Sequence, residues 1–133
     1  MRDTWRKNWL RSIRELSALD WQSSLWGESN NPHHSYVEYI ESYIDDLALA
    51  EGYASPLSQG FVSNDEVEAV ANLHKTVKRY HEPSSPYDHS SILADPLWIN
   101  LTKIAEATRQ SLLSLLIDRE EIEILKRTEP EYP

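Results

Sequence analysis

The chain has 133 residues, which is the length of a single domain, and its 40% hydrophobic residues, with five Trp and seven Tyr, suffice for one core. Its 22 acidic residues against 13 basic ones give a formal net charge of −9, which disfavours binding to nucleic acids and membranes and favours basic partners. The absence of cysteine excludes disulfides and thiolate-ligated metals. Because the sequence has no apolar signal segment and no run of roughly 20 apolar residues, we expect a cytoplasmic protein.

The first predicted helix runs from Arg2 to Leu19. Its large apolar residues recur at steps of four, four and three, which places them on one face of a helix. These residues are Trp5, Trp9, Ile13 and Leu16. We expect the basic residues of this segment to occupy the remaining surface, namely Arg2, Arg6, Lys7, Arg11 and Arg14.

Residues 20–35 lack a helical period and contain Gly27 and Pro32, which is typical of a loop. We expect one helical turn at the start of this loop. Two tryptophans, Trp21 and Trp26, are expected to dock on the core.

The second predicted helix runs from Tyr36 to Ala50 and is closed by Gly52. The expected apolar stripe consists of Val37, Ile40, Ile44 and Leu47. A separate acidic stripe, at positions i, i+3 and i+7, consists of Glu38, Glu41 and Asp45. With Ile40 facing inward, at least one tyrosine should lie near the rim of the core, among Tyr36, Tyr39 and Tyr43.

A capping box predicts the start of the third helix. Ser63 and Glu66 have the spacing at which the side chain of each satisfies a backbone N–H of the other. The helix is expected to continue to about Tyr80. The residues expected inside are Val67, Val70, Ala71, His74 and Val77.

The last long helix is predicted to begin at Asp95, an N-cap residue followed by Pro96 at the first helical position. Its expected apolar face consists of Leu97, Leu101, Ile104, Thr108, Leu112 and Leu115. Because the apolar spacing continues, the helix is expected to extend toward Lys126, followed by a frayed tail at residues 128–133.

These elements predict an all-α fold, with a single helical domain over residues 1–127. We expect a bundle of about four principal helices with an aromatic-rich core and irregular connectors. No segment alternates with period two, so an α+β fold would require short strands within the connectors.

No motif in the sequence supports catalysis or metal binding. His33 and His34 are adjacent and lack the i, i+4 spacing that aims two imidazoles at one ion. Adjacent carboxylates such as Asp45 and Asp46 point about 100° apart on a helix and do not converge on one substrate atom. We therefore expect no enzyme, no catalytic residue, no cofactor and no metal site.

The most unusual feature is the span of residues 21–74, which has nine acidic residues and no Lys or Arg. A surface of this kind speeds association with a basic protein and can imitate the phosphates that a nuclease recognises. The alternative is a solvated face that only keeps the protein soluble.

Four segments follow one another in the chain, namely LSALDWQSSLW, YVEYIESYIDDLALAEG, SNDEVEAVANL and ILADPLWINLTKIAEAT. This order resembles a family of small acidic, mostly uncharacterised bacterial helical proteins, which are similar to immunity proteins of contact-dependent growth inhibition and related polymorphic toxin systems. The resemblance covers residues 16–113 and implies a protein that binds a toxin's C-terminal domain and blocks its active site. Its best-matching positions are Trp21-Gln22, Trp26, Asp45-Asp46-Leu47, Asp65-Glu66 and Asp95-Pro96-Leu97-Trp98. The chain departs from the family in its basic first helix and in the charged segment after Asp118.

The acidic span and the resemblance together predict an immunity-type protein that neutralises a cognate toxin domain, a basic nuclease. Acidic side chains would pair with Lys or Arg of the toxin, and Tyr39 or Tyr43 would anchor it. The expected partner-binding residues are Glu38, Tyr39, Glu41, Tyr43, Asp45, Asp46, Glu51, Asp65 and Glu68. The alternative is a helical domain that binds a small ligand or self-associates, its basic first helix pairing with the acidic helix of a second copy in a weak homodimer.

Overall fold

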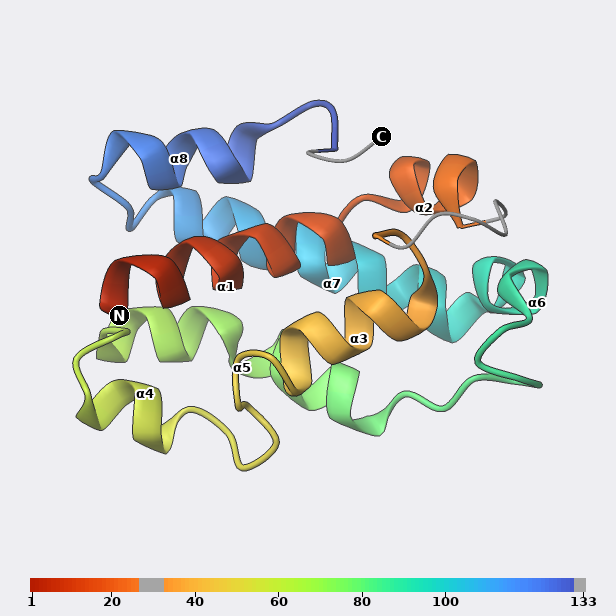
Figure 1. The fold of residues 1–133 in the computed structure, drawn as a ribbon, viewed down its shortest axis with the longest axis horizontal. Coiled ribbons are helices and arrows are strands. Elements are labelled where there is room, and N and C mark those ends of the chain that lie inside the picture. Colours follow the sequence, from red (N-terminus) through yellow and green to blue (C-terminus); the bar gives the residue numbers. More distant parts are fainter. Residues whose placement is uncertain (27–32, 131–133) are drawn as a thin grey trace.

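A computed structural model describes residues 1–26 and 33–130. Within these ranges the chain forms eight helices and no strand, which confirms the all-α prediction (Figure 1). The helices are α1 (Arg2–Leu16), α2 (Leu19–Leu25), α3 (Tyr36–Ile44), α4 (Ala54–Ser58), α5 (Asn64–Arg79), α6 (His89–Ala94), α7 (Pro96–Leu113) and α8 (Arg119–Lys126). The four principal helices expected from the sequence correspond to α1, α3, α5 and α7, while α2, α4 and α6 are short helices within the connectors.

Helix α1 lies at the centre of the bundle. It packs against α3, α7 and α8, and α5 packs against α7 (Figure 1). As predicted, Trp9, Ile13 and Leu16 of α1 are buried in the core. None of the helices in the described ranges combines the length and apolar character needed to cross a bilayer.

The core is rich in aromatic rings, as expected. Trp98 lies 5.5 Å from Trp26, 5.4 Å from Tyr36 and 5.1 Å from Tyr80, measured between ring centroids. The indole N–H of Trp98 donates to Oε1 of Gln22, 2.8 Å away. Gln22 is fully buried, and its amide donates to the Glu15 carbonyl at 3.0 Å, so one side chain joins α1, α2 and α7. Its burial shows that the Trp21-Gln22 motif has a structural role.

Helix α3 ends at Ile44, earlier than the predicted Ala50. Leu47 and Leu49 are 3% and 0% exposed. Positions i and i+2 of a helix point about 200° apart, so a continued helix could not bury both leucines on one side. The chain instead turns, with Ala48 in the left-handed region at φ 55° and Gly52 at φ 90°.

The buried face of α3 also differs from the prediction. Its three tyrosines, Tyr36, Tyr39 and Tyr43, are 7%, 1% and 0% exposed, whereas the residues predicted to face inward, Val37, Ile40 and Ile44, are only partly buried. The expectation of a tyrosine near the rim was therefore wrong. Tyrosine can be buried when its hydroxyl has a partner inside, and here Tyr39 contacts His34 at 2.6 Å and Tyr43 contacts Tyr53 at 2.7 Å.

The start of α5 is as predicted. The Ser63 side chain accepts from the Glu66 N–H at 3.1 Å, and Glu66 accepts from the Ser63 N–H at 2.9 Å, which completes the capping box. Of the residues expected inside, Ala71 is exposed, and Leu73 is buried instead.

The last long helix begins as predicted but does not continue to Lys126. Asp95 caps α7 by accepting from the Leu97 N–H at 3.0 Å, and α7 ends at Leu113. The chain then reverses, because Asp118 caps a new helix, α8, by accepting from the Glu121 N–H at 3.1 Å. This reversal brings Leu125 into the core.

Two residues of the predicted apolar face are exposed, Leu97 in the first turn of α7 at 68% and Leu115 beyond its end at 38%, while Trp98 and Ala105 are fully buried. In the predicted tail, the Thr128 carbonyl accepts from the Trp21 indole at 3.3 Å. Residues 131–133 of that tail, and Gly27 and Pro32 of the predicted loop, lie outside the described residues.

Candidate functional site

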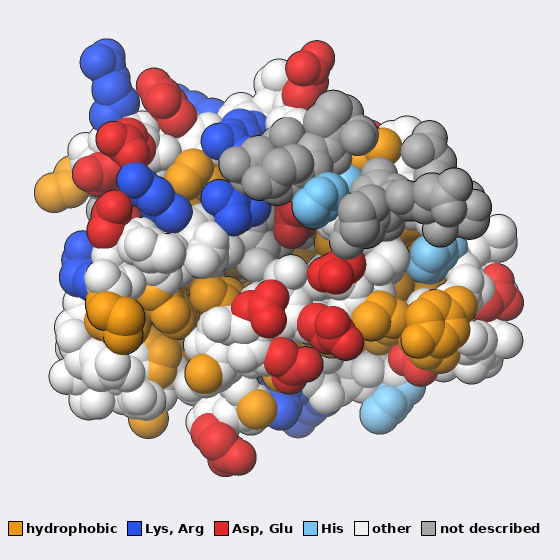
Figure 2. All heavy atoms as spheres, viewed as in Figure 1, with side chains coloured by type: hydrophobic (Ala, Val, Ile, Leu, Met, Phe, Trp, Pro, Cys, Tyr) orange, Lys and Arg blue, Asp and Glu red, His pale blue; other side chains and the backbone are white. Residues whose placement is uncertain are grey.

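Five acidic residues among the predicted partner-binding residues lie on α3 and the turn that follows it. We call this set the acidic surface: Glu38, Glu41, Asp45, Asp46 and Glu51. Glu38 is partly buried and the other four are exposed. Figure 2 shows acidic side chains gathered over α3 in the middle of this face. Because their charges are solvated and close together, they project a negative field toward an approaching partner.

The turn at residues 45–53 carries three of these acids and is held by side chains from two other helices. The Trp5 indole of α1 donates to the Leu47 carbonyl at 3.1 Å. The Lys78 ammonium of α5 donates to the Ala50 carbonyl at 2.9 Å. Long-range hydrogen bonds of this kind fix the backbone from which the acids project, so the surface is held in one arrangement before a partner arrives.

A chain of four side chains anchors both ends of the same turn. The Trp9 indole donates to the Tyr53 hydroxyl at 2.8 Å, the hydroxyls of Tyr53 and Tyr43 are 2.7 Å apart, and the Tyr43 hydroxyl is 3.0 Å from Nδ1 of His74. Tyr43 is in the last turn of α3 and Tyr53 is the N-cap of α4. Burial lowers the pKa of His74, and the charge of Lys78 lowers it further. Burial raises the pKa of both tyrosines, so both stay protonated.

A hollow of about 230 Å³ lies between α1 and α3 beside the acidic surface, and Glu38 and Asp46 are part of its lining. On the α1 side it is lined by Arg11, which donates to the Asn8 side chain at 2.9 Å. Arg11 at this hollow and Lys78 at the Ala50 carbonyl thus place two cationic groups beside the acidic surface, and its five carboxylates outnumber them.

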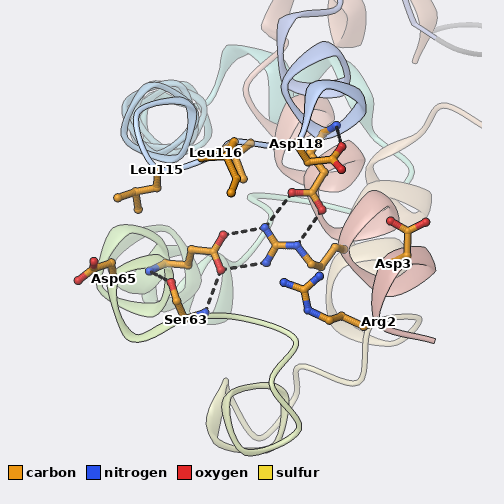
Figure 3. Close-up of a pocket in the computed structure, with 11 residues that line it drawn as sticks. Arg2, Asp3, Ser63, Asp65, Leu115, Leu116 and Asp118 are labelled. Carbon is orange, nitrogen blue, oxygen red and sulfur yellow. Dashed lines mark hydrogen bonds and ion pairs between the residues drawn. The ribbon is translucent and has the colours of Figure 1, made fainter.

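Asp65 and Glu68 do not join this surface. Asp65 lines a separate hollow of about 550 Å³, together with Arg2, Asp3 and Leu115 (Figure 3). Successive residues of a helix are 100° apart, so the α1 residues that line this hollow lie on the opposite side of α1 from those that line the smaller hollow. The two hollows are therefore on opposite sides of α1. Glu68 is exposed, on the side of α5 opposite Val77, which is buried.

The two tyrosines predicted to anchor a partner cannot do so in this structure. Tyr39 is 1% exposed and Tyr43 is fully buried. Their role is internal: Tyr39 packs edge-on against Trp26 with the ring centroids 5.3 Å apart, and Tyr43 belongs to the chain that holds the turn. The prediction failed because the pattern of apolar residues on α3 did not show that each hydroxyl has a buried partner.

Beneath the larger hollow lies a buried ion cluster that the sequence analysis missed. Arg6, expected on the surface, is only 4% exposed and makes paired hydrogen bonds to Glu66 and Glu121 at 2.7–3.0 Å (Figure 3). Its remaining donor bonds the Phe61 carbonyl at 2.8 Å, so all five guanidinium N–H groups are used. The cluster joins α1 to the first turns of α5 and α8.

Within this cluster, Glu66 and Arg6 each shift the pKa of the other. Burial by itself would raise the pKa of Glu66, but hydrogen bonds from Arg6 and from the Ser63 backbone hold that pKa below its ordinary value. Burial would likewise lower the pKa of Arg6, and the two glutamates raise it above its ordinary value. Because all five guanidinium N–H groups bond to partners on other segments, the evident role of the cluster is to hold the three helices together.

The bases of α1 are engaged within the chain, which bears on the alternative of a homodimer through this helix. Arg2 donates to the Gly60 carbonyl at 2.9 Å, Lys7 to Glu120 at 2.7 Å, and Arg14 to the Arg127 carbonyl at 2.8 Å while its guanidinium lies over the Trp21 ring. Pairing them with a second copy would require some of these contacts to be given up.

Histidines do not gather into a metal-binding group. No cluster of three His, Asp or Glu side chains arranged for a metal ion is present among residues 1–26 and 33–130. His34 is buried against Tyr39, whereas the adjacent His33 is exposed.

Two residues important for the acidic surface, His74 and Lys78, were not identified as site residues from the sequence. They are four residues apart on α5, a spacing that places both on one side of a helix, but nothing local shows that this side meets the turn after α3. No family model, curated protein or solved structure matches this chain.

Proposed function

We propose that this protein is an immunity-type inhibitor, which binds a basic toxin domain through the acidic surface and thereby covers the toxin's active site. The observation that carries the proposal is the gathering of Glu41, Asp45, Asp46 and Glu51, all exposed, on one helix and one turn that other helices hold in place. The span that supplies them contains no Lys or Arg. The toxin class comes from the resemblance of the chain's four ordered segments to immunity proteins.

The physical argument for a basic partner is electrostatic. Solvated carboxylates on a firm backbone steer an oppositely charged surface into contact, and they lose little conformational freedom when they pair with it. A nuclease domain that binds nucleic acid presents Lys and Arg where phosphates would lie, so a patterned acidic surface is complementary to it. With Tyr39 and Tyr43 buried, exposed carboxylates carry the contact.

The test is capture of the product of the adjacent upstream reading frame on the immobilised protein at about 0.15 M salt, a concentration at which exposed charges still act across about 8 Å. We expect one basic toxin domain to be retained at one-to-one stoichiometry and its activity to be abolished. Replacing Glu41→Lys together with Asp45→Lys should weaken binding by well over tenfold, because each change turns an attractive charge into a repulsive one.

The matched control is Glu123→Lys, which makes the same kind of charge change on α8, on the far side of α1 from α3 (Figure 1). This variant should bind within about threefold of the unmodified protein, since solvent and salt screen a distant exposed charge. Equal affinities for all three proteins would remove the acidic surface from the interface. A loss of binding in an Asp65→Lys variant instead would move the interface to the larger hollow.

A further inference from the structure

The four hydrogen-bonded side chains beneath the acidic surface have only one arrangement of protons that satisfies them all. The Trp9 indole can only donate, so the Tyr53 oxygen accepts from it. The Tyr53 proton then goes to the Tyr43 oxygen, and the Tyr43 proton goes to Nδ1 of His74. His74 is therefore an acceptor at Nδ1, which requires a neutral imidazole with its proton on Nε2.

Protonation of His74 reverses this chain. Nδ1 of an imidazolium carries a proton and can only donate, so Tyr43 must turn its own proton toward Tyr53. Tyr53 would then accept from both Tyr43 and Trp9 and have no acceptor for its own proton. Tyr53 is 7% exposed, and Tyr43 and Trp9 are fully buried, so water cannot supply the missing acceptor at the present positions of the side chains.

The charged groups near the imidazole also disfavour protonation. Lys78, on the same helix α5, faces it with a positive charge. Tyr43 from α3 and Tyr53 from the start of α4 face it with their rings, at centroid distances of 5.8 and 5.2 Å, and both are neutral. A second positive charge would stand among these groups without a counter-charge.

We propose that Trp9, Tyr53, Tyr43 and His74 form a proton-sensitive latch, which holds the turn at residues 45–53 when His74 is neutral and releases it when His74 is protonated. The release begins at Tyr53, because movement of this residue toward solvent is the simplest way to find an acceptor for its proton. The turn then loses its attachment at α4 and keeps those at Leu47 and Ala50.

The consequence for the acidic surface rests on the proposed function. Asp45, Asp46 and Glu51 project from the turn, so its release on protonation of His74 weakens the binding of a basic partner. Because burial lowers the pKa of His74 from its ordinary value of 6.5, this release takes place on the acidic side of that value. His74 is a positioning residue here, since it acts on the partner only through the turn.

The decisive comparison is between the unmodified protein and a His74→Asn variant. The asparagine Oδ1 is the same number of bonds from the backbone as Nδ1 of histidine, so the acceptor for Tyr43 is kept and the titration is removed. The other histidines are present in both proteins, so the difference between the two isolates His74.

Two measurements need no partner. Nitrogen chemical shifts of the imidazole at pH 7.5 should show the proton of His74 on Nε2. Hydrogen exchange of the Leu49 and Gly52 amides, which donate to the Ile44 and Leu49 carbonyls, should lose at least tenfold in protection between pH 7.5 and 5.5 in the unmodified protein, after correction for intrinsic exchange. In the His74→Asn variant we expect less than a threefold change.

A proton on Nδ1 at pH 7.5, or equal loss of protection in both proteins, would overturn the latch whatever the capture experiment shows. Where the toxin domain is captured, its Kd should rise at least tenfold from pH 7.5 to 5.5 with the unmodified protein and less than threefold with the variant. Equal rises would show that the latch does not regulate binding, and failure of capture with intact latch measurements would count against the proposed function alone.

Discussion

At the scale of single residues, one arginine holds three helices together. Arg6 uses every donor it has on Glu66, Glu121 and the Phe61 carbonyl, and each glutamate belongs to the first turn of a helix. Replacement of this residue leaves two carboxylates in a buried setting without their partner. Breaking a buried ion pair on one side costs far more than breaking an exposed pair.

We expect Arg6→Met to lower the free energy of unfolding by about 3–5 kcal/mol at pH 7, because the partners left behind are buried charges. Urea unfolding followed by circular dichroism measures this change. The control is Lys7→Met, which removes solvent-screened pairs with Glu120 and Asp3 and should leave the urea midpoint nearly unchanged. A loss below about 1 kcal/mol for Arg6→Met would show that the cluster contributes little.

The loss of unfolding free energy in Arg6→Met should depend on pH, and the lowered pKa of Glu66 gives the direction of that dependence. In the unmodified protein the pKa of Glu66 is lowered, so its stabilising contribution is present above pH 4.5, its value in the unfolded chain, and is lost as the pH falls through the folded value. Without Arg6, burial raises the pKa of Glu66, and protonation relieves the unpaired charge. The destabilisation by Arg6→Met should therefore shrink between pH 7 and pH 4; a constant or growing difference would contradict this account.

At the scale of elements, the turn after α3 determines where the acids lie. Ala48 adopts a left-handed backbone conformation that an L-residue with a side chain adopts at a cost of about 1–2 kcal/mol. The burial of Leu47 and Leu49, together with the bonds to Leu47 and Ala50, offsets this cost. Contacts with α1 and α5 therefore determine the conformation of the turn.

Replacing Ala48→Gly should raise the free energy of unfolding by about 0.5–1 kcal/mol, since glycine adopts a positive φ without strain and this gain exceeds the added entropy of the unfolded chain. Ala50→Gly is the matched control, because Ala50 is exposed in the same turn and has no positive φ. We expect that variant to be destabilised by about 0.5–1 kcal/mol in the same urea titration. Two changes of the same sign would show that the backbone of Ala48 is not strained.

At the scale of the whole molecule, α1 separates two differently built regions. On one side α3 and its turn present the acidic surface, and on the other side the start of α5, the start of α8 and the loop after α7 line the larger hollow above the Arg6 cluster. The net charge of −9 is therefore concentrated in part on one face, where Glu41, Asp45, Asp46 and Glu51 are exposed. A concentrated charge acts on association more than on the lifetime of a complex.

If the acidic surface binds a basic partner, the association rate constant should fall at least tenfold between about 0.05 and 0.5 M salt, because the screening length shortens over this range, whereas dissociation should change much less. Stopped-flow mixing with the captured toxin domain measures both rates. The Glu41→Lys, Asp45→Lys double variant should show a flatter salt dependence, and Glu123→Lys should follow the unmodified protein. A salt-independent association rate would place the charges outside the interface.

The sequence by itself determined the helical class, the starts of α5 and α7, and the helix that carries Glu38 and Glu41. These features depend on residues within a turn or two of one another: Ser63 with Glu66, Asp95 with Pro96, and the spacing of apolar residues along α1. Local hydrogen bonds and helical periodicity suffice to establish them.

Only the tertiary structure decided where α3 ends, which face of it is buried, that α8 folds back, and that Arg6 lies inside. Each of these depends on a partner far away in the chain. Tyr43 is buried because Tyr53 and His74 are hydrogen-bond partners of its hydroxyl, and Arg6 is buried because Glu66 and Glu121 accept its hydrogen bonds. A buried polar group is stable only with its hydrogen-bond partners in place, and the pattern of residues along one helix does not contain the positions of partners on another.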